Sequence, residues 1–117
     1  MWGLAFKPGT DDMREAPSLV LIDSLLKHGC VVSAYDPVAT DEAKRRLGEN
    51  SITYCDEMYQ ACVDADALVI VTDWKQFRVP SWAVLRKTMK NRLIIDGRNL
   101  YDPAEAAREG FVYNRIG

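Results

Sequence analysis

The sequence is poor in the residues that build metal centres and disulfide frameworks. It has one histidine, His28, and three cysteines, Cys30, Cys55 and Cys62, which are widely spaced and include no CxxC pair. An odd number of separated cysteines argues against a disulfide framework and favours idle thiols in a reduced, cytoplasmic protein. No histidine and cysteine grouping has the spacing of a zinc site. We therefore expect no metal site, and nothing in the sequence resembles a Ser-His-Asp set.

The chain also lacks an excess of basic charge and a long apolar run. Its 117 residues include 15 Lys and Arg against 17 Asp and Glu, a net charge of −2. Such a balance provides no electrostatic field for nucleic acid and no polybasic stripe for a lipid surface. No apolar run approaches the ~18 residues of a membrane-spanning helix, and no signal-peptide pattern opens the sequence. Nucleic acid and membrane are not expected as partners.

What the sequence does contain is an alternation of short β-rich runs with helical patterns. The runs cover residues 2–6, 30–35, 52–54, 67–72, 92–96 and 111–113, and the helical patterns cover 18–28, 42–47, 56–62, 81–88 and 102–108. This alternation predicts an α/β fold with a Rossmann-like, doubly wound sheet of five or six mostly parallel strands flanked by helices. The length predicts one domain, 1–117. Because the first run starts at residue 2, we expect a domain excised from a longer chain.

The loop after the first run is the most distinctive stretch of the chain. It lacks the glycines of a GxGxxG dinucleotide fingerprint, so an ordinary NAD-binding half is not expected. It offers two cations, Lys7 and Arg14, that suit a phosphate or a sugar hydroxyl. The alternative is that these cations pair with Asp11, Asp12 and Glu15 and hold the loop in shape.

Further candidate residues follow later strands. Arg98 comes directly after the run 92–96, where it is either an anion clamp at the carboxyl edge of the sheet or an exposed residue of a turn. Trp74 and Phe77 can stack on a base, although aromatic side chains beside a strand end more often cover the core. The basic run 44–46 is most simply the solvated face of a short helix. From the residues alone, the prediction is an α/β domain with an anion-accepting edge.

At this point the motifs resemble a known family. Residues 3–18, Gly-Leu-Ala-Phe-Lys-Pro-Gly-Thr-Asp-Asp-Met-Arg-Glu-Ala-Pro-Ser, resemble the start of the C-terminal, UDP-binding domain of the UDP-glucose 6-dehydrogenases, within the UDP-glucose/GDP-mannose dehydrogenase family. The motifs Tyr-Asp-Pro at 35–37, Thr-Asp-Trp at 72–74 with Phe77, and Asp-Gly-Arg-Asn at 96–99 match that family in the same order. The resemblance covers essentially the whole chain.

The resemblance implies an enzyme that oxidises C6 of UDP-glucose to a carboxylate in two NAD-dependent steps. It implies that Phe6, Lys7 and Arg98 bind the UDP-sugar and that Arg14 reaches the NAD pyrophosphate. The NAD would be bound mainly by an N-terminal domain, and the catalytic cysteine would lie in a central region. Neither of these parts is in this chain, since none of its three cysteines has the Gly-x-Cys-x-Pro-Lys context. The full enzyme is expected to be a cytoplasmic homo-oligomer that contains the missing domains.

Two points stay open in the sequence. Asp73 stands where many relatives have Glu, which leaves the role of that carboxylate unassigned. Dehydrogenases of GDP-mannose and of UDP-N-acetylhexosamines share the motif Phe-Lys-x-x-x-Asp-Asp-x-Arg-Glu. The residues Ala-Phe-Lys-Pro-Gly-Thr and Trp74 favour UDP-glucose as the substrate. A non-catalytic nucleotide-binding module and a domain kept for subunit assembly are the alternatives from other functional classes. The isolated chain is expected to have no dehydrogenase activity.

Overall fold

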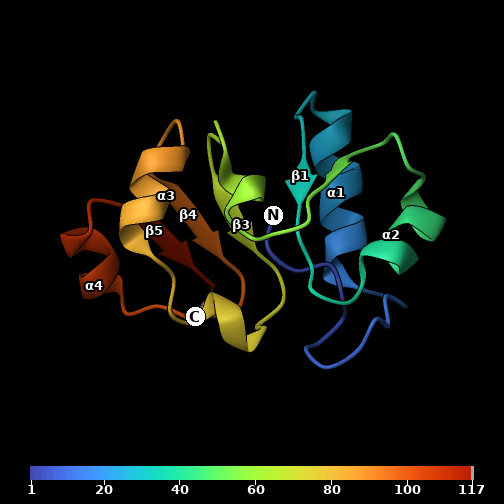
Figure 1. Ribbon diagram of the computed structural model, residues 1–117, viewed down its shortest axis with the longest axis horizontal. Helices are drawn as coiled ribbons and strands as arrows, with labels where there is room; N and C mark the ends of the chain where they lie inside the picture. The colour runs from blue at the N-terminus through green and yellow to red at the C-terminus, as the bar shows by residue number, and fades with distance from the viewer. Residues whose placement is uncertain (117) are drawn as a thin grey trace.

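The computed structural model describes residues 1–116 and has a parallel sheet surrounded by helices (Figure 1). The helices are α1 (Pro17–Lys27), α2 (Thr40–Leu47), α3 (Trp82–Thr88) and α4 (Pro103–Arg108). The strands are β1 (Ser33–Ala34), β2 (Thr53–Tyr54), β3 (Leu68–Ile70), β4 (Leu93–Asp96) and β5 (Val112–Arg115). Two short 3₁₀ helices, η1 (Gln60–Cys62) and η2 (Lys75–Phe77), lie before and after β3.

The strands form two small sheets that the start of the chain joins. One sheet pairs β1 with β2, the other has the order β3-β4-β5, and all of these pairings are parallel. Trp2 lies between the sheets and forms parallel bridges to Tyr35 and Ile70. If the Trp2 segment is counted as the first strand, the lateral order is 3-2-1-4-5-6, which is that of a doubly wound Rossmann sheet. The predicted fold class is confirmed.

The first strand is shorter than the predicted run 2–6. The N–H of Trp2 donates to the carbonyl of Val69 and that of Gly3 to the carbonyl of Tyr35, both at 2.8 Å. The next two amides, of residues 4 and 5, donate instead to the carboxylate of Asp36. A side chain thus replaces the neighbouring strand as acceptor, which ends the ladder after residue 3.

Two hydrophobic cores lie on opposite faces of the sheet. Because side chains alternate along a strand, Met1 and Trp2 enter different cores. Leu4, which follows the end of the strand, enters the same core as Met1. The first core contains the inner residues of α3 and α4, and in it Trp2 stacks on Phe77 with ring centroids 5.0 Å apart. The second core contains those of α1 and α2. The helices of each half of the chain therefore cover a different face.

The helix ends follow their sequence signals in most places. Pro17 occupies the first turn of α1, Gly29 follows its end with a φ of 80°, and Ser81 caps α3 by accepting from the N–H of Val84. α2 begins at Thr40, after Ala39, and no side chain caps its first turn. The predicted helix 56–62 is wrong, because only the 3₁₀ helix η1 forms there.

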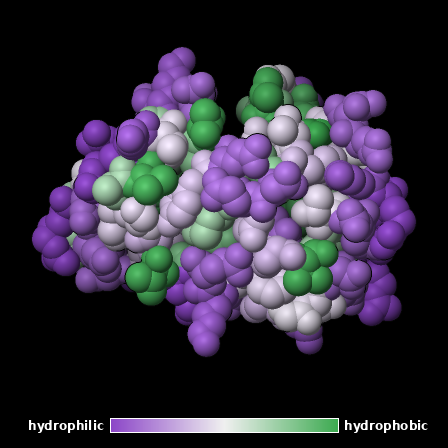
Figure 2. All heavy atoms as spheres, viewed as in Figure 1, coloured by the Kyte–Doolittle hydropathy of each residue, from purple (hydrophilic) through white to green (hydrophobic). Residues whose placement is uncertain are grey.

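The face of the molecule drawn in Figure 2 is mostly polar. In the view of Figure 2, apolar atoms form separate small patches among hydrophilic side chains. Among residues 1–116, no helix is long and apolar enough to cross a membrane.

Candidate functional site

The site is built at the carboxyl edge of the sheet, where the Trp2 segment has neighbours from the two halves of the chain. On one side of the Trp2 segment lies β1, which the chain reaches through α1. On the other side lies β3, the first strand of the second half of the chain. Open parallel sheets bind ligands at such a switch point, outside the carboxyl ends of the strands. The loops that follow the Trp2 segment, β1, β3 and β4 all leave this edge, at the lower side of Figure 1.

Asp36 connects three of these loops. The residue is only 3% exposed and lies just after β1. It accepts five hydrogen bonds of 2.8–3.0 Å, from the backbone N–H groups of Leu4, Ala5, Val38 and Ala39 and from Nε1 of Trp74. An ionised carboxylate is an acceptor only, so it matches this set of donors. In the sequence Asp36 stood out only as part of the family motif at 35–37, and no role was assigned to it.

The loop 6–16 is closed at its base and open at its tip. The N–H of Phe6 donates to the carbonyl of Asp12 at 2.7 Å, and Ser18 Oγ donates to the carbonyl of Leu4 at 2.6 Å. The Phe6 ring is 48% exposed, and Lys7 beside it is also exposed. Among residues 1–116, no carboxylate lies within ion-pair distance of the Lys7 ammonium, so the ion-pair alternative fails for this residue.

For Arg14 the ion-pair alternative is correct in this structure. Its Nε and Nη2 donate to the two oxygens of Asp12 at 3.1 and 3.0 Å. The side-chain and backbone hydrogen bonds from Arg14 lower the pKa of Asp12 to about 2. The pair borders a shallow hollow of about 360 Å³ that also includes Glu42 and Arg46 of α2. Arg14 therefore lies on the α2 side of the loop, with an exposed guanidinium in a fixed orientation.

Arg98 is held by Asp73 across the carboxyl edge. Its Nη2 and Nε donate to Oδ1 of Asp73 at 2.7 and 3.2 Å, while Arg78 Nη2 lies 3.2 Å from Oδ2. Burial opposes the ionisation of Asp73, but the hydrogen bond from Arg98 and the nearby charges outweigh it and hold the pKa of this carboxyl below its usual value. Asp73 thus has a structural role, as the carboxylate that orients Arg98; Arg78, its second partner, was not marked by any sequence motif.

The turn that carries Arg98 is built on a buried acid. Asp96, fully buried at the end of β4, accepts from the backbone N–H groups of Arg98 and Leu100 and from the hydroxyl of Tyr113 at 2.6 Å. Burial and the bond to Asp96 raise the pKa of Tyr113 to about 12. The buried Asp96 therefore fixes the backbone around Arg98, whereas Arg98 itself remains exposed.

A hydrogen bond joins the first loop to the end of β3, and the residue that follows there, Asp73, binds Arg98. Thr72 Oγ1 donates to the carbonyl of Ala5 at 2.7 Å. The residues that follow these two are Phe6 in the first loop and Asp73, the partner of Arg98, after β3. Phe6, Lys7 and Arg98 thus belong to one part of the edge, and Arg14 belongs to the hollow beside α2. The two aromatic candidates have structural roles. Phe77 is fully buried in the core, and Trp74 donates a hydrogen bond to Asp36.

The chain does not fit a dinucleotide in the usual Rossmann manner. Asp36 stands at the end of the second strand in the Rossmann order, the place of the acid that binds a ribose hydroxyl. Here that acid is buried and already accepts five internal donors. The glycine loop is replaced by loop 6–16, which carries two exposed cations, Lys7 and Arg14. Among residues 1–116, no group of histidines, cysteines and carboxylates is arranged to hold a metal ion.

A Rossmann-order sheet with cations on its switch-point loops defines a nucleotide-binding α/β domain, and sequence comparison identifies its family. Residues 1–103 match the profile of the UDP-glucose/GDP-mannose dehydrogenase family, UDP binding domain. The chain belongs to this family, as the resemblance of its motifs predicted.

The similar proteins are nucleotide-sugar dehydrogenases several times longer than this chain. A UDP-glucose 6-dehydrogenase of Pseudomonas aeruginosa is 54% identical over 121 residues, which cover 100% of this chain and 27% of that protein. The UDP-glucose 6-dehydrogenase TuaD of Bacillus subtilis is 43% identical over 98% of this chain and 25% of its own length. The chain spans about a quarter of these relatives and matches their C-terminal part.

Solved structures support the fold. A UDP-glucose dehydrogenase from Pyrobaculum islandicum superposes with a TM-score of 0.78 at 31% identity and covers 97% of this chain and 23% of its own. An NDP-N-acetyl-D-galactosaminuronic acid dehydrogenase from Methanosarcina mazei Go1 gives 0.82 at 30% identity, with 99% and 23% covered.

Proposed function

We propose that this chain is the UDP-sugar-binding domain of an NAD-dependent UDP-glucose 6-dehydrogenase, which converts UDP-glucose to UDP-glucuronate. The observation that carries the proposal is the arrangement at the switch point. Phe6 and Lys7 follow Ala5, whose carbonyl accepts from Thr72, and Arg98 is bound to Asp73, the residue after Thr72. An exposed ammonium and an oriented guanidinium suit the diphosphate, and an exposed ring suits a base or a sugar face.

Each site residue has a distinct role in this proposal. The Lys7 ammonium, with no carboxylate partner among the described residues, is a mobile point charge for a phosphate or a sugar hydroxyl. Arg98, fixed by Asp73, presents the remaining donors of its fork from the facing loop. Because Arg98 is already held by Asp73, its side chain loses little conformational freedom on binding.

In this proposal, NAD is bound mainly by a different part of the enzyme. Arg14 lies on the α2 side of the loop and offers one cationic contact, which suits the pyrophosphate of an NAD held by an N-terminal domain. NAD supplies the acceptor for the hydride when it is bound. The acid that would hold its ribose in this fold is internal, so we assign this chain no NAD site of its own.

The oxidation requires residues beyond this chain, and the fragment alone is proposed to be inactive. Cys55 and Cys62 are buried, and burial raises the pKa of both thiols, that of Cys62 to about 12, which makes them poor nucleophiles. The full enzyme is proposed to be a cytoplasmic homo-oligomer. UDP-glucose is the proposed sugar because the relatives with the highest identities here are named for it, and a UDP-N-acetylhexosamine or GDP-mannose is the alternative.

Co-expression tests this function. The N-terminal three quarters of the Pseudomonas aeruginosa relative are produced with this chain, and NADH formation from UDP-glucose is followed by absorbance. We expect no activity from either part alone and restored activity from the pair. Arg14→Ala in the pair should raise the KM for NAD more than the KM for UDP-glucose. Turnover by this chain alone, or a pair that binds UDP but never forms NADH, contradicts the proposal and favours a non-catalytic binding module.

A further inference from the structure

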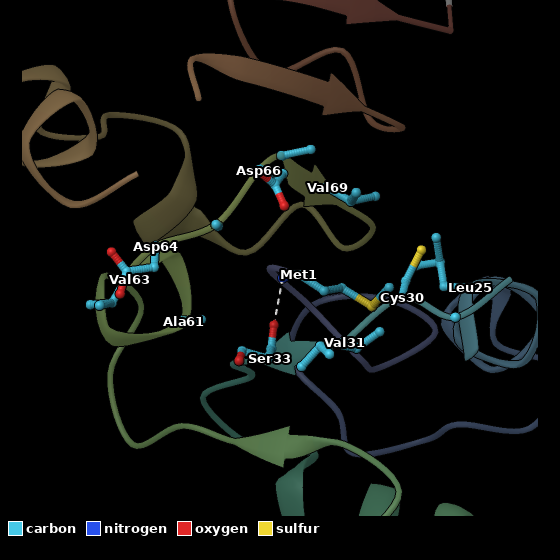
Figure 3. A pocket seen from close by; sticks show the side chains of 14 residues that line it. Met1, Leu25, Cys30, Val31, Ser33, Ala61, Val63, Asp64, Asp66 and Val69 are labelled. Atoms are coloured by element: carbon cyan, nitrogen blue, oxygen red, sulfur yellow. Dashed lines mark hydrogen bonds between the residues drawn. The ribbon is translucent and has the colours of Figure 1, made fainter. Parts of the chain in front are cut away.

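The two edges of the sheet differ in the charge that they offer to a ligand. At the amino ends of β1 and β3 lies a cavity of about 670 Å³, whose lining is mostly apolar and includes the carboxylates of Asp64 and Asp66 (Figure 3). No described Lys or Arg residue lines this cavity. At the carboxyl edge, by contrast, Lys7, Arg78 and Arg98 are all exposed. An anion is therefore attracted to the carboxyl edge rather than to the cavity.

Arg78 is placed at the carboxyl edge by a loop that is anchored on both sides. Gln76 Nε2 donates to the hydroxyl of Tyr35, just after β1, at 2.9 Å. Phe77, the residue before Arg78, is fully buried, and its carbonyl accepts from the hydroxyl of Tyr101 after β4. These contacts fix the backbone at residue 78, whereas the Arg78 side chain is 52% exposed. The guanidinium of Arg78 therefore stands on a rigid part of the edge.

Arg78 and Arg98 share one carboxylate. Nη2 of Arg78 donates to Oδ2 of Asp73 at 3.2 Å, and Nη2 of Arg98 donates to Oδ1 at 2.7 Å. The two guanidinium groups come from different loops and lie on the two oxygens of the same acid. Because one carboxylate carries one negative charge, it cannot neutralise both cations. The group of three side chains keeps an excess positive charge that an anion would balance.

Both guanidinium groups also keep donors for a ligand. A guanidinium has five N–H donors in a planar fork. Among residues 1–116, the side chain of Arg78 makes one hydrogen bond and that of Arg98 makes two, all to Asp73. Such a fork binds two phosphate oxygens at once. Two forks held side by side therefore suit two linked phosphates.

A purely structural role does not account for Arg78 as well. Its ion pair with Asp73 is largely exposed, and exposed pairs contribute little to stability. The loop is already held by the contacts of Gln76 and Phe77, which do not involve the Arg78 side chain. Asp73 would orient Arg98 without a second cation.

We propose that Arg78 is a second arginine of the UDP-sugar site and that it binds the diphosphate together with Arg98. This inference rests on the proposed function, because it takes the carboxyl edge as the place where the UDP-sugar binds. It adds a binding residue from the loop after β3 and assigns to it the diphosphate rather than the base.

Titration of variants with UDP, UMP and ADP-ribose tests the proposal. Arg78→Gln removes the charge of the side chain, and Arg78→Lys keeps the charge but loses the planar fork. Lys75→Gln is the matched control, because it removes the same charge from an exposed position of the same loop. Calorimetry measures the affinities at one salt concentration, and urea unfolding of each variant reports any structural effect.

Arg78→Gln should weaken UDP binding by about fivefold or more and reduce the preference for UDP over UMP, which lacks the second phosphate. Arg78→Lys should recover part of the lost affinity. Lys75→Gln should bind UDP as the unchanged chain does. The midpoint of urea unfolding should stay the same in all three variants, since the side chains are exposed.

The outcomes separate this inference from the proposed function. UDP binding that is lost with Arg98→Ala but unchanged with Arg78→Gln would overturn the role of Arg78 and leave the proposed function in place. An equal loss with Lys75→Gln, or a loss for ADP-ribose and not for UDP, would overturn it as well. Absence of UDP binding by the unchanged chain would overturn both.

Discussion

Nε1 of Trp74 donates a hydrogen bond of 3.0 Å to Oδ2 of Asp36, and this bond ties the loop after β3 to the end of β1. The two residues are 38 positions apart in the chain and belong to different halves of the sheet. The same oxygen accepts the amides that end the first strand. The position of Phe6 and Lys7 therefore depends on one buried carboxylate.

Replacing Asp36 with Asn should be strongly destabilising. The amide would turn an NH₂ group toward backbone donors and leave buried N–H groups without an acceptor, at a cost of about 3 kcal/mol or more. Urea unfolding measures this loss. Asp11→Asn, a change at an exposed position of the same loop, serves as the control and should stay within about 0.5 kcal/mol of the unchanged chain. Equal losses for the two variants would show that Asp36 does not hold these loops.

Gly3 should tolerate no side chain. Its φ is +98°, and an added Cβ would lie 2.5 Å from the Thr72 side chain and 2.6 Å from its backbone nitrogen. Gly3→Ala is expected to cost about 3 kcal/mol or more, since both backbone strain and a clash with a central strand end are involved. Gly29→Ala is the matched control, because its φ is +80° but no atom lies within 4 Å of the added Cβ. That change should cost about 1 kcal/mol. Urea unfolding of both variants decides whether the close approach matters.

The stability of the chain should rise with pH between 6 and 8. Burial holds the pKa of the Met1 amino group at about 6 in the folded chain, against 8.0 for its ordinary value. In this interval the unfolded chain binds the proton and the folded chain does not, so the free energy of unfolding increases as pH rises. Two pKa units correspond to about 2.7 kcal/mol.

Unfolding by urea at pH 6, 7 and 8 measures this dependence. Acetylation of the Met1 nitrogen should remove most of it, whereas His28→Gln should leave it in place. A slope that persists after acetylation and disappears in the His28 variant would assign the effect to the histidine instead.

The sequence predicted the fold better than it predicted the lengths of the elements. Strands covered by helices on both faces have short apolar runs in the sequence. Glycine and proline lie at the ends of α1 and α4. The order of the elements could therefore be derived from the sequence. The early end of the first strand could not be derived, because its cause is a carboxylate 32 residues away. The segment 56–62 has helical spacing, but within it only the 3₁₀ helix η1 forms.

The candidate site was predicted by residue type and not by partner. Spacing placed Lys7, Arg14 and Arg98 after strands but left open whether each was paired. The structure pairs Arg14 with Asp12 and Arg98 with Asp73, and leaves Lys7 without an ion pair among residues 1–116. Arg78 lay in no motif, and Thr72 lay in the family motif 72–74 with no role assigned to it. Their contacts arise from the position of the loop after β3 beside its neighbours.

Isothermal titration of the chain with UDP tests the central claim most directly. We expect weak binding by the unchanged chain, because it holds only one side of the proposed cleft. Lys7→Ala and Arg98→Ala should each weaken it by about tenfold or more, the value of a charge-assisted hydrogen bond. Lys87→Ala and Arg108→Ala, at exposed positions on α3 and α4, should leave it unchanged. Absence of UDP binding, or binding that neither Lys7→Ala nor Arg98→Ala alters, would contradict the account.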